Sequence, residues 1–199
     1  DTALVTAAAG EDWDQLVARC VAADLSGVEC LSGIPGLVGA TPMQNVGAYG
    51  QEVAESIVAV HALTRNTLEN VTFATEECHF AYRTSRFKGP DRDRFVITSV
   101  TYRLWRNRRP EIRYADLASH LADAGVDMEA LAPGHVASTA VRDAVLAVRR
   151  SKSMVLDETD PNARSAGSFF LNPVLTTAQV ERVRQGCSDR GGDPASVPS

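Results

Sequence analysis

The apolar positions at the start of the chain predict a strand followed by a helix. Residues 2–8 are apolar and rich in β-branched side chains, which is typical of a strand. In residues 11–23, the apolar side chains of Trp13, Val17 and Cys20 recur at intervals of four and three residues. Positions with this spacing share one face of a helix, so the segment is expected to be an amphipathic helix.

Three later segments have the apolar and β-branched composition of strands. They are residues 56–64, 71–74 and 94–104. Residues 64–67 are polar and predict a hairpin turn between the first two strands. The basic residues 106–110 break the pattern of the third.

Helical patterns dominate the rest of the chain. Residues 117–124 predict a short helix. Residues 137–149 predict a longer one, which Ser138 or Thr139 could cap. A Thr-Thr-Ala-Gln capping box predicts a last helix over residues 176–184.

The composition is that of an ordinary globular protein. Of the 199 residues, 44% are hydrophobic and 23% are charged, which suits one domain or one domain and part of another. The net charge of −5 argues against general binding to nucleic acid or to an anionic membrane. No apolar run approaches the roughly 18 residues of a membrane span, and the first residues lack the basic start of a signal peptide.

The cysteines and histidines predict no metal site. Cys20, Cys30, Cys78 and Cys187 are scattered without a C-x-x-C pair, and the four histidines show no ligand spacing. Four cysteines in a chain of this length do not form a dense disulfide framework, so reduced thiols are expected.

Residues 31–50, here called the glycine loop, contain five glycines and two prolines and predict an irregular segment with a short helix after Pro42. Such a backbone can approach a ligand closely, and its N–H groups suit a pyrophosphate. The amides of Gln44 and Asn45 suit the edge of a heteroaromatic ring, and Tyr49 adds a stacking face. The loop matches neither G-x-G-x-x-G nor a Walker A sequence, and a tight connection that binds nothing is the alternative.

Two further segments carry candidate chemistry. In residues 78–88, Arg83 and Arg86 lie among other polar side chains, and an Arg here could grip a carboxylate with two hydrogen bonds, although a solvated basic loop is the alternative. In residues 165–173, the hydroxyl of Ser168 lies next to two phenylalanines and could donate a proton in a dry site. The segment contains no G-x-S-x-G nucleophile elbow, so a hydrolase triad is unsupported. By itself the segment is more simply interpreted as a turn into a strand.

Taken together and in this order, three segments resemble one enzyme family. They read GIPGLVGATPMQNVGAYGQE (33–52), CHFAYRTSRFK (78–88) and GSFFLNP (167–173). A fourth, RRSKSMVLD (149–157), is similar to a family segment that usually has Gly in place of Ser153. The family is that of UDP-N-acetylenolpyruvoylglucosamine reductase (MurB), and the resemblance spans nearly the whole chain.

The resemblance implies an α+β fold with an FAD-binding domain of the vanillyl-alcohol-oxidase (PCMH) type. That domain would cover residues 1–113, followed by a connecting helical segment over 114–150 and the start of a smaller α+β substrate-binding domain over 151–199. The family also has a Gly-rich loop before this region and a catalytic Glu after it. Because the chain starts at Asp1 and ends in a loop, we expect a fragment cut at both ends, which without the upstream Gly-rich loop retains FAD weakly or not at all.

The activity implied by the family is the NADPH-dependent, FAD-mediated reduction of UDP-N-acetylglucosamine enolpyruvate to UDP-N-acetylmuramate, in cytoplasmic peptidoglycan precursor synthesis. A UDP-sugar is the expected partner, without nucleic acid, membrane or metal, and no protein partner can be inferred. The alternatives are another FAD-dependent oxidoreductase or oxidase of the same flavin-domain superfamily, and an inactive nucleotide-binding fragment.

The resemblance also implies roles for particular residues. Arg83 matches the Arg that stabilises the substrate carboxylate, and Ser168 matches the serine that acts as general acid. Substrate-binding positions correspond to Tyr82, Tyr114, Lys152 and Asn172. FAD-contacting positions correspond to Gly33, Ile34, Pro35, Gly36, Gly39, Gln44, Asn45, Gly47, Ala48 and Tyr49.

Overall fold

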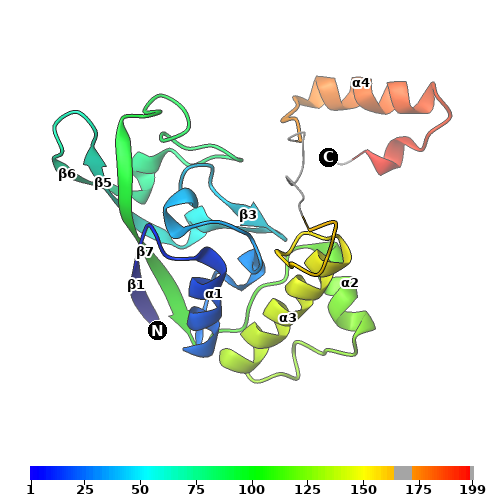
Figure 1. The fold of residues 1–199 in the computed structure, drawn as a ribbon. Helices are drawn as coiled ribbons and strands as arrows, with labels where there is room; N and C mark the ends of the chain where they lie inside the picture. The colour runs from blue at the N-terminus through cyan, green and yellow to red at the C-terminus, as the bar shows by residue number, and fades with distance from the viewer. Residues whose placement is uncertain (164–171, 198–199) are drawn as a thin grey trace. The chain divides into compact units, whose positions relative to one another are not determined.

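The computed structural model describes residues 1–163 and 172–197 (Figure 1). The chain divides into two compact units, Asp1–Ser165 and Ala166–Ser199, and each is described by itself. The domain boundaries at residues 113 and 150 that the family implies remain predictions.

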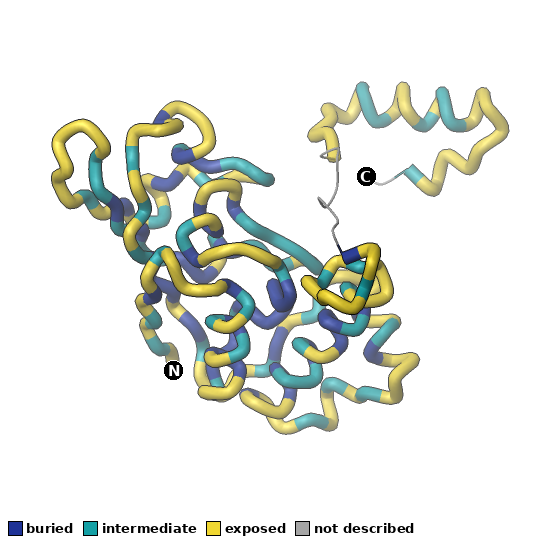
Figure 2. Tube along the Cα trace, in the orientation of Figure 1, coloured by how far each residue is buried: buried dark blue, intermediate teal, exposed yellow. Residues whose placement is uncertain are grey.

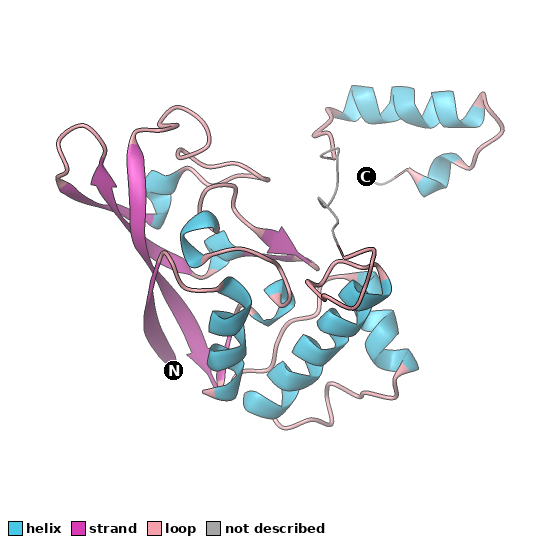
Figure 3. Ribbon diagram, in the orientation of Figure 1, coloured by secondary structure: helices cyan, strands magenta, loops and turns pink. Residues whose placement is uncertain are grey.

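The first unit is built on an antiparallel sheet (Figure 3). Its strands lie in the order β1 (Thr2–Ala8), β7 (Phe95–Arg106), β5 (Ile57–Thr64) and β6 (Asn70–Ala74), and β2 (Leu25–Ser26) pairs with the end of β7. The short strands β3 (Gly47–Ala48) and β4 (Gln51–Glu52) form a separate pair. All four long strands were predicted from their β-branched composition, and residues 65–67 form the predicted hairpin turn.

Three helices complete the first unit, and one lies in the second. They are α1 (Trp13–Ala22), α2 (Ala115–Asp123), α3 (His135–Ser151) and, in the second unit, α4 (Thr177–Ser188). Single 3-10 turns are η1 (Glu29–Leu31), η2 (Val38–Ala40), η3 (Val53–Glu55), η4 (Thr75–Cys78) and η5 (Pro194–Ser196). The four predicted helices are confirmed, and the predicted capping box of Thr176 and Gln179 begins α4.

The sheet and α1 bury the main core (Figure 2). Trp13 and Val17 on α1 pack in one cluster with Val100 and Tyr102 on β7, and all four side chains are buried. The indole N–H of Trp13 donates to the carbonyl of Leu31 at 3.0 Å. This bond fixes the first residue of the glycine loop against α1.

A second, smaller core joins the two later helices. Leu117 and Leu121 on α2 pack with Val141 and Val145 on α3, and Cys30 from η1 reaches into the same cluster. Helix α3 is thereby held beside the segment that leads into the glycine loop.

Two local predictions were wrong for physical reasons. Helix α3 begins at His135, whose backbone N–H donates to the carboxylate of Asp24 at 2.7 Å, so this distant carboxylate caps the helix instead of Ser138 or Thr139. No helix follows Pro42; residues 41–45 form turns that end at Asn45, whose backbone is left-handed with φ of 46°.

No helix among the described residues is long and apolar enough to cross a membrane. Within residues 1–163 and 172–197, no group of three or more His, Cys, Asp or Glu side chains is placed to hold a metal ion.

Candidate functional site

The first half of the glycine loop is tied to α1 and α3 through one carboxylate. Asp14 Oδ1 accepts the backbone N–H of Gly33 at 2.6 Å. The same carboxylate accepts two hydrogen bonds from the guanidinium of Arg142 on α3, at 2.6 and 2.9 Å. Burial alone would raise the pKa of Asp14, but the hydrogen bonds from Arg142 and Gly33, with the charges of Arg142 and Arg149, lower it below its usual value.

Two glycines of the loop lie where a side chain has no room. A Cβ atom on Gly33, whose φ is 71°, would lie 2.8 Å from Leu146 Cδ2 of α3. A Cβ atom on Gly39 would lie 2.6 Å from the Cβ of Ala9, and the Gly39 N–H donates to the Ala9 carbonyl at 2.9 Å. Close approach to a helix and to the end of β1 therefore requires glycine at these positions.

The second half of the loop is held from within by Asn45. Its side chain is buried; Nδ2 donates to Glu52 Oε2 at 2.7 Å and to the carbonyl of Ala81 at 3.2 Å. Its Oδ1 accepts the N–H of Ala54 at 3.1 Å. The amide group of Asn45 is thus engaged by the protein, so a cofactor contact by this residue would come through its backbone.

Arg83 brings the segment 78–88 against the glycine loop. One Nη of its guanidinium donates to the carbonyl of Gly47 at 2.5 Å, and the other lies 3.4 Å from the carbonyl of Asn45. Its backbone is left-handed, with φ of 54°, and the ring of Tyr82 lies 5.3 Å from the guanidinium carbon. The hydroxyl of Ser85 adds a second link by donating to the carbonyl of Met43 at 2.7 Å.

The glycine loop, Arg83 and Arg149 of α3 line a cavity of about 180 Å³. Its lining residues are Ile34, Gln44, Val46, Gly47, Ala48, Arg83 and Arg149. Four of the predicted cofactor-binding residues therefore lie around one hollow with the predicted catalytic Arg83. The lining contains two guanidiniums and no carboxylate, which favours an anionic ligand.

The sequence predictions missed Arg149 as a site residue. It lies in the last turn of α3, and a Cβ atom on Gly33 would come within 3.2 Å of its Nε. The only signal in the sequence is that Arg149 begins the RRSKSMVLD segment of the family resemblance. That segment pointed to Lys152, which is exposed at the C-terminal cap of α3.

Two tyrosines of the predicted site, Tyr49 and Tyr114, are in contact. The rings of Tyr49 and Tyr114 meet edge to face, with their centroids 5.6 Å apart. Burial raises the pKa of the Tyr49 phenol, and the charge of Arg149 opposes this shift. Tyr114 and Tyr82 are both 42% exposed, so each has surface available for a ligand.

Two predicted residues cannot be compared with this cavity. Ser168 lies outside the described residues, and Asn172 is an exposed residue of the second unit. Their roles remain predictions.

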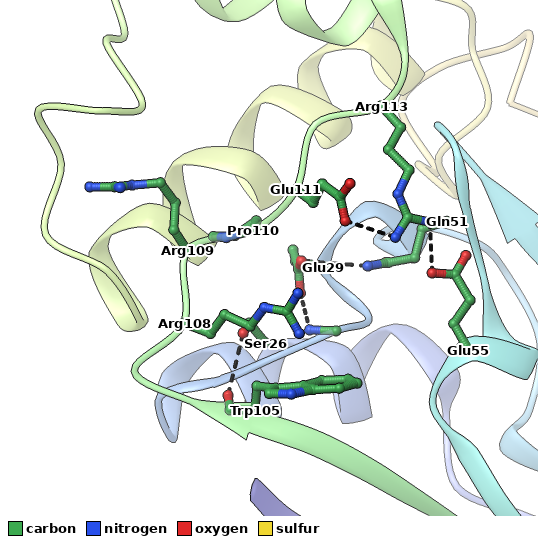
Figure 4. A pocket seen from close by; sticks show the side chains of 11 residues that line it. Ser26, Glu29, Gln51, Glu55, Trp105, Arg108, Arg109, Pro110, Glu111 and Arg113 are labelled. Carbon is green, nitrogen blue, oxygen red and sulfur yellow. Dashed lines mark hydrogen bonds and ion pairs between the residues drawn. The ribbon is translucent and has the colours of Figure 1, made fainter. Parts of the chain in front are cut away.

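A separate cavity of about 280 Å³ lies beside the connection from β7 to α2 (Figure 4). Glu29 is buried there, and its Oε2 accepts the N–H groups of Gly27 at 2.6 Å and Val28 at 3.0 Å. Arg113 donates to Glu55 at 2.7 Å and to Glu111 at 2.8 Å. The acidic residues that line this cavity therefore pair with backbone N–H groups or with Arg113. None of the predicted site residues lines this cavity.

Comparison with known proteins relates the chain to one enzyme. Residues 1–68 match a family model described as an FAD binding domain. The chain is 50% identical over 193 residues to UDP-N-acetylenolpyruvoylglucosamine reductase of Thermobifida fusca, covering 96% of this chain and 51% of that protein. It is 49% identical to the Salinispora arenicola protein of the same name, over 98% of this chain and 52% of that protein. The chain thus spans about half the length of these relatives.

A solved structure agrees on the fold. The crystal structure of UDP-N-acetylenolpyruvylglucosamine reductase (MurB) from Thermus caldophilus matches with a TM-score of 0.57 at 23% identity, over 90% of this chain and 53% of that one. The α+β fold and the family resemblance predicted from the sequence are confirmed.

Proposed function

We propose that this chain, whose sequence is similar to the UDP-N-acetylenolpyruvoylglucosamine reductases, binds FAD through the glycine loop and supplies a catalytic arginine for their reaction. The reaction is the NADPH-dependent reduction of UDP-N-acetylglucosamine enolpyruvate to UDP-N-acetylmuramate, a step of peptidoglycan precursor synthesis. A cytoplasmic location follows from the use of NADPH and belongs to the same proposal.

The residues present fit FAD. The match to an FAD binding domain covers the glycine loop, whose path is fixed by close approaches of Gly33 to Leu146 and of Gly39 to Ala9. Residues 33–39 and 44–49 would hold the cofactor. Bound FAD would supply two-electron chemistry, accepting a hydride from NADPH and passing it to the enolpyruvyl double bond.

Arg83 is suited to stabilise the charge that this reduction creates. Addition of hydride at C3 of the enol ether, conjugate to the carboxylate, moves negative charge onto that carboxylate. The guanidinium of Arg83 is held by the carbonyls of Gly47 and Asn45, so it is positioned before the substrate arrives. A preorganised cation of this kind stabilises the transition state without reorganising during the reaction.

The remaining roles follow the family. Ser168 would protonate C2, which completes the addition of one hydride and one proton across the double bond. Tyr82, Tyr114, Lys152 and Asn172 would hold the UDP-sugar. Lys152 lies one helical turn beyond Arg149, which lines the cavity, and this placement supports its role.

One observation carries the proposal: Arg83 lines the same cavity as Ile34, Gln44, Gly47 and Ala48, four of the residues expected to contact FAD, although it lies 35 to 49 positions after them in the sequence. A chance resemblance in two separate segments would not bring them together in this way.

The test is product analysis with the flavin-loaded protein. NADPH and the enolpyruvyl UDP-sugar should yield NADP⁺ and a UDP-sugar heavier by two hydrogen atoms. A reaction in D₂O should place deuterium at C2, from the solvent proton, and at C3, because the N–H hydrogen of a reduced flavin exchanges with solvent before it is transferred. UDP-N-acetylglucosamine, which lacks the enolpyruvyl group, is the control and should cause no NADPH oxidation. Rapid oxidation of the reduced flavin by oxygen, with no response to the enolpyruvyl substrate, would favour an oxidase instead.

A further inference from the structure

Arg83 lies in a tight turn with an unusual backbone conformation. The N–H of Ala81 donates to the carbonyl of Thr84 at 3.2 Å, and the N–H of Thr84 donates back to the carbonyl of Ala81 at 3.1 Å. Within this turn Arg83 is left-handed, with φ of 54°, which is uncommon for an arginine. Such a conformation persists only where the surrounding structure holds it, so the contacts on either side of the turn decide where Arg83 lies.

The first of these contacts comes from the side-chain amide of Asn45. Its Nδ2 donates to the carbonyl of Ala81, the first residue of the turn, at 3.2 Å and to Glu52 Oε2 at 2.7 Å. Its Oδ1 accepts the N–H of Ala54 at 3.1 Å, and the side chain is buried. The amide therefore fixes the start of the turn against the glycine loop and against the residues that follow the loop.

The second contact comes from the hydroxyl of Ser85, directly after the turn. This buried hydroxyl donates to the carbonyl of Met43 at 2.7 Å and accepts the N–H of Phe87 at 3.2 Å. Met43 and Asn45 are two residues apart in the glycine loop. The turn that carries Arg83 is thus bound at both ends to the same short stretch of the loop.

The guanidinium of Arg83 depends on this placement of its backbone. In the described parts of the chain, no carboxylate oxygen lies within 4.0 Å of it. Its hydrogen bonds go to the carbonyls of Gly47 and Asn45 in the same loop. A shift of the turn would therefore move the guanidinium relative to these carbonyls, and a misplacement of about 1 Å is enough to slow a reaction strongly.

We propose that Asn45 and Ser85 are positioning residues for Arg83, an inference that rests on the proposed function of this arginine. Their side chains act through the turn and need no contact with the substrate. The Asn45 side chain, which the family resemblance places at FAD, then serves the geometry of the catalytic arginine, while its backbone stays available to the cofactor.

A double-mutant cycle on the flavin-loaded protein tests this proposal. Anaerobic stopped-flow spectroscopy measures flavin reduction by NADPH and flavin reoxidation by the enolpyruvyl UDP-sugar as separate steps. Ser85→Ala should slow reoxidation by about 3- to 10-fold, the factor expected for the loss of one neutral hydrogen bond, and should change reduction by less than about twofold. In an Arg83→Gln background the same substitution should slow reoxidation by less than about 1.5-fold, because no guanidinium is left to position.

Two further variants complete the comparison. Ser56→Ala is the matched control, because the buried hydroxyl of Ser56 also donates to a backbone carbonyl, that of Val53 in η3, at 3.0 Å. This control should change neither step. Asn45→Gly removes the amide but allows the left-handed backbone, whose φ is 46°, and should slow reoxidation at least as much as Ser85→Ala, again only when Arg83 is present.

Three outcomes would overturn the proposal. Equal slowing of reoxidation by Ser85→Ala with and without Arg83 would show that Ser85 supports only the fold. Equal slowing of reduction and reoxidation would show the same, and reoxidation of Ser85→Ala at the wild-type rate would remove Ser85 from the positioning of Arg83. If Asn45→Gly no longer holds flavin, the cycle with Ser85→Ala decides.

A second measurement separates this inference from the proposed function. If Arg83→Gln reoxidises at the wild-type rate, the proposed function is wrong, and the placement of Arg83 is then tested by NMR without flavin or substrate. The guanidinium signals of Arg83, assigned by their loss in Arg83→Gln, should be separate for the two Nη groups in the wild type and in Ser56→Ala, because hydrogen bonds to two carbonyls hinder rotation. They should average in Ser85→Ala and Asn45→Gly, and separate signals in all four proteins would contradict the positioning.

Discussion

The pairing of Arg142 with Asp14 should control both the stability of the first unit and the geometry of the glycine loop. Arg142→Leu removes a bidentate partner whose two hydrogen bonds measure 2.6 and 2.9 Å, and it leaves the Asp14 carboxylate with the N–H of Gly33. Helix α3 then loses this link to α1 and to the start of the loop, while the bond between Asp14 and Gly33 remains.

The exposure of the pair sets the size of the effect. Exposed pairs contribute about 0–1 kcal/mol, and breaking a fully buried pair costs about 3–5 kcal/mol. The Arg142 side chain is 15% exposed and that of Asp14 is 33% exposed, so the pair lies between these limits. We expect a loss of about 2 kcal/mol in the free energy of unfolding, which lowers the melting temperature by about 4–8 °C in a domain of this size.

The effect should depend on pH with a definite sign. The pKa of Asp14 is lowered in the folded protein, so its ionised form contributes stability above its unfolded pKa of about 4. That contribution is lost as the pH falls through the lower, folded value. The difference between wild type and Arg142→Leu should therefore be full at pH 7 and pH 5 and should shrink at pH 3.5.

Urea unfolding at these three pH values is the assay. Arg19→Leu is the control, because Arg19 on α1 lies 3.9 Å from Glu11 with both side chains exposed, and it should change stability by less than about 0.5 kcal/mol. An Arg142→Leu effect that equals the control, or that stays constant down to pH 3.5, would refute the reasoning.

Two further predictions test the loop and the thiols. Gly39→Ala should destabilise the protein by about 1–3 kcal/mol in urea, because its Cβ atom would lie 2.6 Å from that of Ala9, while Gly10→Ala meets nothing within 4 Å and should be nearly neutral; equal effects would contradict the tight approach. A thiol reagent at pH 8 should label the partly exposed Cys187 rapidly in the folded protein and all four cysteines in denaturant, because burial raises the pKa of Cys20 to about 11 and those of Cys30 and Cys78 to about 12. Rapid labelling of more than one cysteine in the folded protein would show that this burial is wrong.

The regular elements were predictable because their signals are local. Strand β1 and helix α1 follow directly from the spacing of apolar residues. The start of α3 was not predictable in this way, because the carboxylate that caps it belongs to Asp24, which is 111 residues away from His135 in sequence. The sequence pattern of the helix itself cannot predict a capping residue that lies so far away in the chain.

Contacts between residues distant in sequence also explain why the shape of the glycine loop and the position of Arg149 were not predicted. The residues of the loop were identified by resemblance, but its shape depends on bonds to distant groups, such as those from Gly33 to Asp14 and from Asn45 to Ala81. Arg149 lines the cavity only because α3 packs against Gly33. The sequence alone showed it as one basic residue at the end of a helix.

The central claim is that Arg83, held by the carbonyls of Asn45 and Gly47 in the glycine loop, acts on the carboxylate of the enolpyruvyl substrate. Anaerobic stopped-flow spectroscopy tests it most directly, because flavin reduction by NADPH and flavin reoxidation by the enolpyruvyl UDP-sugar are seen separately. Arg83→Gln should slow reoxidation by about 100- to 1,000-fold, the usual loss for one preorganised donor at a developing charge, and should leave reduction by NADPH within a few-fold of wild type. Reoxidation at the wild-type rate in this variant, or equal slowing of both steps, would contradict the account.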